Sequence, residues 1–193
     1  MSEISSQQPF VVPSEIPFEY LRGHDLEECL YWLLDAMGAK ELEWHVGGRG
    51  SGAADGGRDL EAHFLTPTPD GEIVQQKWWI EAKGRSGTVE PCDVKAAVLN
   101  AGNRSDLDVL IVATNTAFSN PTRDWVREWQ GHHPRPVVRL WERARLEKLL
   151  SEYPSVVVRL FSKALSIQGR LEVIRYRVWN FASLASNEQL LQM

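Results

Sequence analysis

The chain has 193 residues, of which 43% are hydrophobic and 24% charged, and its formal net charge is −5. This suits one globular core with a small appendage, and no apolar run approaches the roughly 18 residues that a membrane span needs. The acidic balance argues against a simple nucleic-acid-binding module, because phosphate binding depends largely on Lys and Arg. It argues less against an acidic site that holds a divalent cation, because the cation reverses the local charge.

The N-terminal sequence and the cysteines favour a cytoplasmic protein. The N-terminus has neither the basic start nor the apolar run of a secretory signal. The two cysteines, Cys29 and Cys92, are too few for a disulfide scaffold and lack the spacing of zinc ligands. Each lies in an apolar helical pattern, so we expect both thiols to be buried in a reducing compartment.

The first 20 residues contain three prolines and little periodicity, so we expect residues 1–20 to form a loosely packed N-terminal arm. A helix is predicted over residues 25–37, where leucines recur at helical spacing. Asp25 and Glu28 have the spacing of a capping box, and Gly38 is a suitable stop.

Strands and helices alternate beyond this first helix. Strands are predicted over residues 41–46, 58–65, 74–83, 109–114 and 136–141, and helices over residues 91–100, 121–130 and 143–152. The segment before the second strand is rich in glycine, and a turn-rich segment joins the second and third strands. The alternation predicts an α/β domain over residues 21–153, with a mixed central β-sheet flanked by helices.

The C-terminal segment, residues 154–193, is predicted to be a helical extension. One apolar face runs from Val156 to Leu165, and a second runs from Leu171 to Leu184. No obvious stop ends the second helix, so we expect either a linker to a missing module or an oligomerisation element.

Two carboxylates and one ammonium group are predicted to converge on one face of the sheet. Because side chains alternate along a strand, Glu81 and Lys83 project from the same face. A hairpin centred on Asp70-Gly71 places Asp59 opposite a residue within about one position of Glu81. The spacing along the chain therefore predicts this cluster.

Such a cluster suits metal-assisted hydrolysis of phosphodiesters. Carboxylates are hard oxygen ligands for Mg²⁺ or Mn²⁺, so Asp59 and Glu81 are the predicted metal ligands. The cation would stabilise charge on the phosphate, and Lys83 would position or activate the attacking water. The alternative is a solvated ion pair between Glu81 and Lys83, with Asp59 as a turn residue, because such short patterns are common.

The chain resembles the Mrr-like branch of the PD-(D/E)XK nucleases. The resemblance covers about residues 25–150. It rests on the first helix, the glycine-rich approach to Asp59, the Glu81-Ala82-Lys83 motif, the strand and turn over residues 109–119, and the final strand and helix. It implies a restriction-endonuclease-like core and a metal-dependent DNA endonuclease, the effector nuclease of a restriction or anti-phage defence system.

The resemblance also implies an acidic residue on the first helix, which here is Glu27. Helix geometry supports this assignment, because Glu27 lies beside Leu34 at the edge of the apolar face. Glu28 points away and is expected to serve the cap, and the alternative for Glu27 is a charge on the rim of the core. Glu61 shares the face of Asp59 and is the candidate for an extra carboxylate of the site, although a surface role is favoured for it.

Four basic residues are candidates for contacts with DNA. Arg49 lies in the glycine-rich segment, Arg58 stands where members of the branch usually have an aliphatic residue, and Lys77 and Arg85 belong to a local basic rim. An ordinary surface role is the alternative for these residues. A second departure from the branch is Glu81, where many members have Gln.

The resemblance further implies partners. DNA is the expected substrate, and a sensor or ATPase module, fused or associated, is an expected partner. Cleavage of two strands would favour a homo-oligomer, a dimer or higher, and no membrane partner is expected. Nothing in the sequence indicates base recognition, so specificity is expected from elsewhere. Two alternatives stay open: an inactive nuclease-fold module for interaction or assembly, and a junction-resolving nuclease.

Overall fold

The computed structural model describes residues 11–45, 58–167, 169–171 and 174–175. Its centre is a sheet with five strands, β1 (Lys40–Trp44), β2 (Leu60–Pro67), β3 (Ile73–Ala82), β4 (Val109–Ala113) and β5 (Val137–Trp141), in that spatial order. The helices are α1 (His24–Ala36), α2 (Pro91–Gly102), α3 (Asn120–His132), α4 (Arg143–Glu152) and α5 (Pro154–Leu160), with 3-10 turns at Pro13–Glu15, Phe18–Tyr20 and Ser162–Ala164. Strands β1, β2 and β3 pair antiparallel, and β3, β4 and β5 pair parallel, which confirms the predicted mixed sheet.

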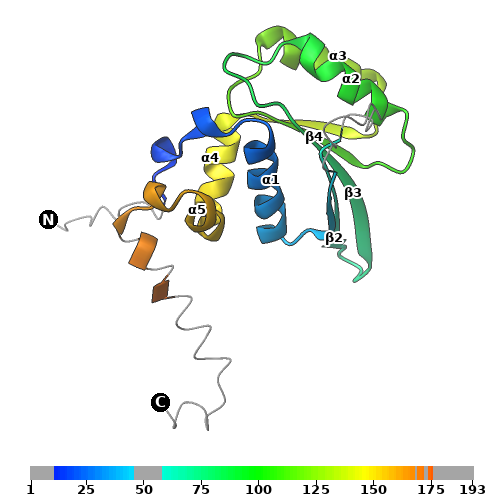
Figure 1. Cartoon of the computed structure of the whole chain (residues 1–193). Coiled ribbons are helices and arrows are strands. Elements are labelled where there is room, and N and C mark those ends of the chain that lie inside the picture. The colour runs from blue at the N-terminus through cyan, green and yellow to red at the C-terminus, as the bar shows by residue number, and fades with distance from the viewer. Residues whose placement is uncertain (1–10, 46–57, 168, 172–173, 176–193) are drawn as a thin grey trace, which may run out of the picture.

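Two helical layers cover the sheet (Figure 1). Helices α1, α4 and α5 pack on one face, and α2 and α3 pack on the other. Side chains alternate along β4 and so contribute to the cores on both faces of the sheet. Ile111 packs in the core under α1, α4 and α5, whereas Leu110 and Val112 pack in the core under α2 and α3. All residues of β4 are buried, which explains why its sequence is an uninterrupted apolar run.

The β2–β3 hairpin has the predicted register. Its ladder runs from the pair Pro67–Ile73 to the pair Leu60–Ile80. The turn between the strands includes Gly71, whose φ of 88° favours glycine. The hairpin therefore brings the residues just before β2 next to the carboxyl end of β3.

Helix α1 begins differently from the prediction. Its N-cap is Gly23, with φ 51° and no side-chain cap, so the capping box expected from Asp25 and Glu28 is wrong. Glu28 instead accepts a hydrogen bond from Trp32 Nε1 at 3.3 Å. The predicted stop is confirmed, because Gly38 follows the helix with φ 90°.

The described part of the predicted N-terminal arm is not loosely packed. Val11, Ile16 and Phe18 are buried in the same core as α1. Phe18 begins the second of two short 3-10 turns, and Val11 and Ile16 lie just outside these turns. Such short turns lack the periodicity that announces a helix or strand. The rest of the arm, residues 1–10, lies outside the described residues.

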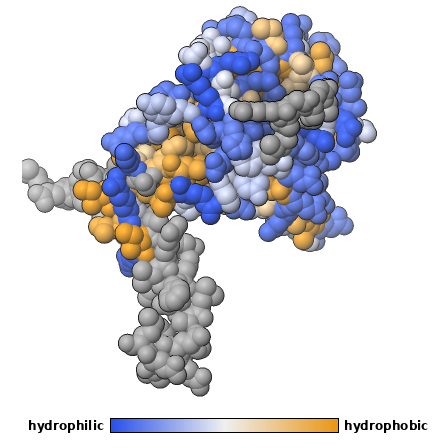
Figure 2. Space-filling view, viewed as in Figure 1, coloured by the Kyte–Doolittle hydropathy of each residue, from blue (hydrophilic) through white to orange (hydrophobic). Residues whose placement is uncertain are grey.

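The C-terminal extension begins as part of the core. Val156 and Leu165 are buried against it, as the first predicted apolar face required. Beyond them, Ile167, Leu171 and Ile174 are exposed, and hydrophobic residues gather at the surface of this described C-terminal segment (Figure 2). Most of the predicted second helix lies outside the described residues. None of the described helices is long and apolar enough to cross a membrane.

The two cysteines differ in their surroundings. Cys29 is buried in α1, and burial raises the pKa of its thiol to about 12. Cys92 is exposed, contrary to the prediction. It lies in the first turn of α2, two residues from Val94, and a two-residue step turns a side chain to the other side of a helix.

Candidate active site

The side chains of Asp59, Glu81 and Lys83 come together at the carboxyl end of β3. The last pair of the β2–β3 ladder is Leu60–Ile80. Asp59, the residue just before β2, therefore lies opposite Glu81, the next residue of β3. Lys83 Nζ forms an ion pair with Glu81 Oε1, which places both side chains on one face of β3. The structure therefore shows the convergence that the hairpin predicts.

Asp59 has an unfavourable environment for a negative charge. Burial raises the pKa of Asp59 to about 7, and repulsion from Glu81 and Glu27 adds to the shift. The backbone N–H of Ala82, which donates to Asp59 Oδ2 at 2.6 Å, and the ammonium group of Lys83 act in the opposite direction. Three carboxylates thus lie close together beside one ammonium group.

Glu81 presents an oxygen that lacks a partner. The residue is 6% exposed, and its Oε2 makes no hydrogen bond within the part of the chain that the structure describes. A buried unpaired carboxylate oxygen is costly unless a cation or donor satisfies it. The crowding that raises the pKa of Asp59 would be relieved by the same cation, so the two residues fit a divalent ion.

A cation at this place would depend on few protein ligands. Among the described residues, no group of three or more His, Cys, Asp or Glu side chains is arranged as a metal site. Mg²⁺ is often held by one or two carboxylates, with water and substrate oxygens as the other ligands. The pair Asp59 and Glu81 is compatible with that kind of site.

The end of β4 holds the segment that carries Lys83. Thr114 Oγ1 donates to the carbonyl of Lys83 at 2.8 Å, and Asn115 Oδ1 accepts from the backbone N–H of Arg85 at 2.8 Å. Both residues are buried. In the sequence this segment stood out only by resemblance, and the structure shows its physical role, which is to fix the backbone on both sides of Gly84.

Gly84 allows α1 to approach the carboxyl end of β3. A Cβ at this position would lie 2.8 Å from Arg22 Cα and 2.9 Å from Gly23 N. Real Cβ atoms do not approach backbone atoms so closely, so the residue must be glycine for the two segments to pack as they do. This approach brings the first turn of α1, and with it Glu27, to the site.

Glu27 lies with the cluster, as the helix geometry predicted. Its charge contributes to the raised pKa of Asp59. Its Oε2 accepts a hydrogen bond from Trp44 Nε1 at 3.0 Å. The sequence did not single out Trp44, because an isolated tryptophan in a short strand carries no signal of a polar contact.

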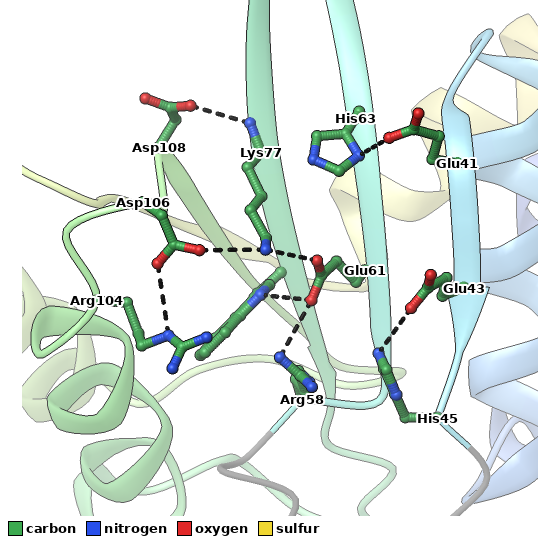
Figure 3. A network of polar contacts seen from close by, with 11 residues as sticks. Glu41, Glu43, His45, Arg58, Glu61, His63, Lys77, Arg104, Asp106 and Asp108 are labelled. Atoms are coloured by element: carbon green, nitrogen blue, oxygen red, sulfur yellow. Dashed lines mark hydrogen bonds and ion pairs between the residues drawn. The ribbon is translucent and has the colours of Figure 1, made fainter.

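Two of the predicted DNA contacts lie in a network around Glu61 (Figure 3). Lys77 Nζ is 2.7 Å from Glu61 Oε1, and Arg58 Nη1 is 3.1 Å from Glu61 Oε2. Trp79 Nε1 donates to the same carboxylate at 3.0 Å. Although burial raises the pKa of Glu61, the bonds and charges of Lys77 and Arg58 outweigh it and hold the pKa below its ordinary value.

The expected surface role of Glu61 is therefore wrong, because Trp79 and the neighbouring strands bury it. A third predicted DNA contact, Arg85, pairs with Asp93 at 2.9 Å and is 48% exposed. The fourth, Arg49, lies outside the described residues. The part that these four residues play in DNA binding stays a prediction.

Comparisons with known proteins bear on the family and the fold of the chain. The family model Mrr_cat, described as a restriction endonuclease, matches residues 18–150. The chain is similar to the MspJI restriction endonuclease in complex with a 27-mer oligonucleotide, with TM-score 0.50 and 17% identity over 76% of this chain. It is also similar to the DNA modification-dependent restriction endonuclease AspBHI, with TM-score 0.47 and 17% identity over 72% of this chain. The chain covers 34% of each of those two chains, about a third of their length. No curated protein matches the chain.

Proposed function

The chain belongs to the restriction endonuclease family, and from this premise we propose that it hydrolyses DNA phosphodiester bonds with the help of a divalent cation. The observation that carries the proposal is the cluster of Asp59, Glu81 and Lys83 at the carboxyl end of β3, inside the region that the family model matches. We further propose that this nuclease serves a restriction or anti-phage defence system.

Asp59 and Glu81 would hold Mg²⁺ or Mn²⁺. The support is the Oε2 of Glu81, which has no partner among the residues that the structure describes, and the raised pKa of Asp59, because both mark a place that lacks positive charge. When bound, the cation supplies positive charge to the phosphate oxygens and lowers the pKa of a coordinated water.

The remaining side chains of the cluster have complementary roles. Lys83, 21% exposed, would donate to the attacking water or to a phosphate oxygen, and its pair with Glu81 keeps the ammonium group at the site. Glu27 would accept hydrogen bonds from water beside Asp59. These roles need acidic and basic groups close together, and their support is the ion pair of Lys83 with Glu81 and the repulsion of Asp59 by Glu81 and Glu27.

Contacts with the DNA backbone would come from basic residues near this cluster. Arg85 is the best placed of the described candidates, because it is half exposed and follows Lys83 by two residues. It would exchange its partner Asp93 for a phosphate. Arg58 and Lys77 would bind phosphate only by leaving Glu61, so we expect a smaller contribution from them.

The active assembly is proposed to contain more than one copy of the chain, because cleavage of both strands requires two sites. The exposed side chains of Ile167, Leu171 and Ile174, spaced by four and three residues, support a helical contact at the C-terminal end. A fused or associated sensor module is the proposed source of DNA specificity.

The direct test is a plasmid-nicking assay with the purified chain and Mg²⁺ or Mn²⁺. We expect metal-dependent nicking that EDTA stops. Lys83→Ala should reduce the rate by at least about 100-fold, because it removes the ammonium group from the reacting centre. Thermal unfolding of the same preparation should show that the variant is folded.

The outcomes separate the proposal from its alternatives. Nicking that persists in Lys83→Ala would contradict the assignment of the site. Absence of nicking in monomeric and assembled preparations would favour an inactive interaction module. Cleavage confined to branched DNA, with linear and supercoiled DNA left intact, would favour a junction-resolving nuclease.

A further inference from the structure

Trp44 makes a polar contact with the candidate active site. Its indole N–H donates to Glu27 Oε2 at 3.0 Å, between residues that are 17 positions apart in the chain. The bond therefore joins the end of β1 to the first turn of α1. An indole N–H bonded to a carboxylate is a charge-assisted hydrogen bond, and it fixes the orientation of the carboxylate as well as stabilising it.

The indole ring of Trp44 is itself held by two stacked rings. The ring of His24 stacks on it with a centroid distance of 4.5 Å and an interplanar angle of 16°. The ring of Tyr31 stacks on it at 5.5 Å and 25°. Both partners belong to α1, so two turns of the helix fix the direction in which the indole N–H points.

The strand that carries Trp44 is also tied to Asp59. Trp44 pairs with Leu60 in the β1–β2 ladder. The next residue, His45, donates its backbone N–H to the carbonyl of Asp59 at 2.8 Å. The end of β1 thus contacts Asp59 through its backbone and Glu27 through a side chain, and it sets the relation between the two carboxylates.

We propose that Trp44 is a positioning residue that holds the Glu27 carboxylate beside Asp59 in the orientation that cation binding and hydrolysis require. This rests on the proposed function and deepens it, because it assigns a role to a side chain outside the reacting cluster. Trp44 acts through Glu27 and does not touch the reacting atoms.

The test is Trp44→Phe, which removes the indole N–H and keeps an aromatic ring between His24 and Tyr31. Calorimetric titration with Mn²⁺ in the absence of DNA should show an affinity about 3-fold weaker than that of the wild type. This is less than the ~10-fold typical for the hydrogen-bond partner of a metal ligand, because Glu27 is not itself a proposed ligand. In nicking assays the Mg²⁺ concentration at half-maximal rate should rise by a similar factor.

The bond from Trp32 to Glu28, the residue after Glu27 in α1, provides a matched control. Trp32 Nε1 donates to Glu28 Oε1 at 3.3 Å, on a side of the helix where Arg159 covers the Trp32 ring. Trp32→Phe removes the same kind of bond away from the site, so cation affinity should stay unchanged. Combining Trp44→Phe with Glu27→Gln should give no further loss beyond Glu27→Gln alone, because one residue acts through the other.

Each outcome is decisive. If the wild type binds Mn²⁺ and nicks DNA while Trp44→Phe matches it in both assays, Trp44 has no positioning role and the proposed function stands. The inference would also be overturned if Trp44→Phe weakened Mn²⁺ binding by the same factor in the Glu27→Gln variant as in the wild type, because Trp44 would then act by another route. A wild type without Mn²⁺ binding or nicking would overturn the proposed function itself. Should Trp44→Phe fail to fold, benzothienylalanine at position 44 keeps the shape and lacks the N–H, and the same affinity loss is expected.

Discussion

Glu61 and Glu81 are buried carboxylates on the same face of neighbouring strands, yet their surroundings are opposite. Glu61 is bonded to Lys77, Arg58 and Trp79, and these partners lower its pKa. Glu81 has one cationic partner, Lys83, and one oxygen without a partner among the described residues. Figure 3 shows how completely the first carboxylate is surrounded.

The difference separates a structural role, for Glu61, from the catalytic role proposed for Glu81. A carboxylate whose oxygens are all bonded adds stability and has nothing left to offer a ligand. A buried carboxylate with a free oxygen, next to an aspartate whose pKa is raised to about 7, lowers stability until positive charge arrives. The oxygen of Glu81 without a partner among the described residues, at the end of β3, and the fully bonded carboxylate of Glu61, on β2, therefore distinguish the proposed active site more clearly than residue type does.

The largest expected effect on activity comes from replacing Glu81 by alanine, and the same replacement of Glu61 serves as the comparison. Glu81→Ala should reduce nicking by about 100-fold and change the free energy of unfolding by less than about 1 kcal/mol. Glu61→Ala should lower the free energy of unfolding by about 2 kcal/mol, less than for a fully buried pair because Lys77 is partly exposed, and should keep most of the activity. Urea unfolding and nicking rates measure the two effects, and similar profiles for both variants would break the comparison.

A smaller effect is expected where α1 meets β3. Gly84→Ala would force a Cβ against the backbone of Arg22, so the free energy of unfolding should fall by about 1–3 kcal/mol. Displacement of α1 should also slow nicking by about 10-fold. Gly87→Ala is the control, because nothing lies within 4 Å of a Cβ there. Equal behaviour of the two variants would show that the close approach is unimportant for the site.

The smallest expected effect is on the pH dependence of stability. Because the pKa of Asp59 is raised to about 7 in the folded chain, folded Asp59 keeps a proton that the unfolded chain has already released. Its contribution to stability is present at low pH and is lost as the pH rises toward about 7. Asp59→Asn should therefore raise the melting temperature in EDTA, by about 3–6 °C near pH 8 and by less near pH 5.

Melting curves of the two proteins across this pH range test the sign. If the melting temperature of Asp59→Asn exceeded that of the wild type by the same amount at every pH, the raised pKa of Asp59 would be contradicted. Added Mn²⁺ should stabilise the wild type more than the variant, because the variant lacks one of the two proposed carboxylate ligands.

Much of the architecture follows from local patterns in the sequence. The apolar run of β4 and the leucines of α1 mark their elements because burial repeats with the period of each structure. The turn at Gly71 sets the hairpin register, and register alone brings Asp59 beside Glu81. That is why the convergence of Asp59, Glu81 and Lys83 was predictable without any knowledge of how the helices pack on the sheet.

The tertiary structure decided the features that depend on distant neighbours. Val11, Ile16 and Phe18 are buried against the core, although no periodic pattern marks them. The guanidinium of Arg58 lies 5.1 Å over the Trp79 ring and pairs with Glu61, and no local pattern announces either contact. The contact of Trp44 with Glu27 likewise joins a strand to a helix. Periodicity reports which side of an element is buried, whereas the partner of each side chain depends on how the elements pack together.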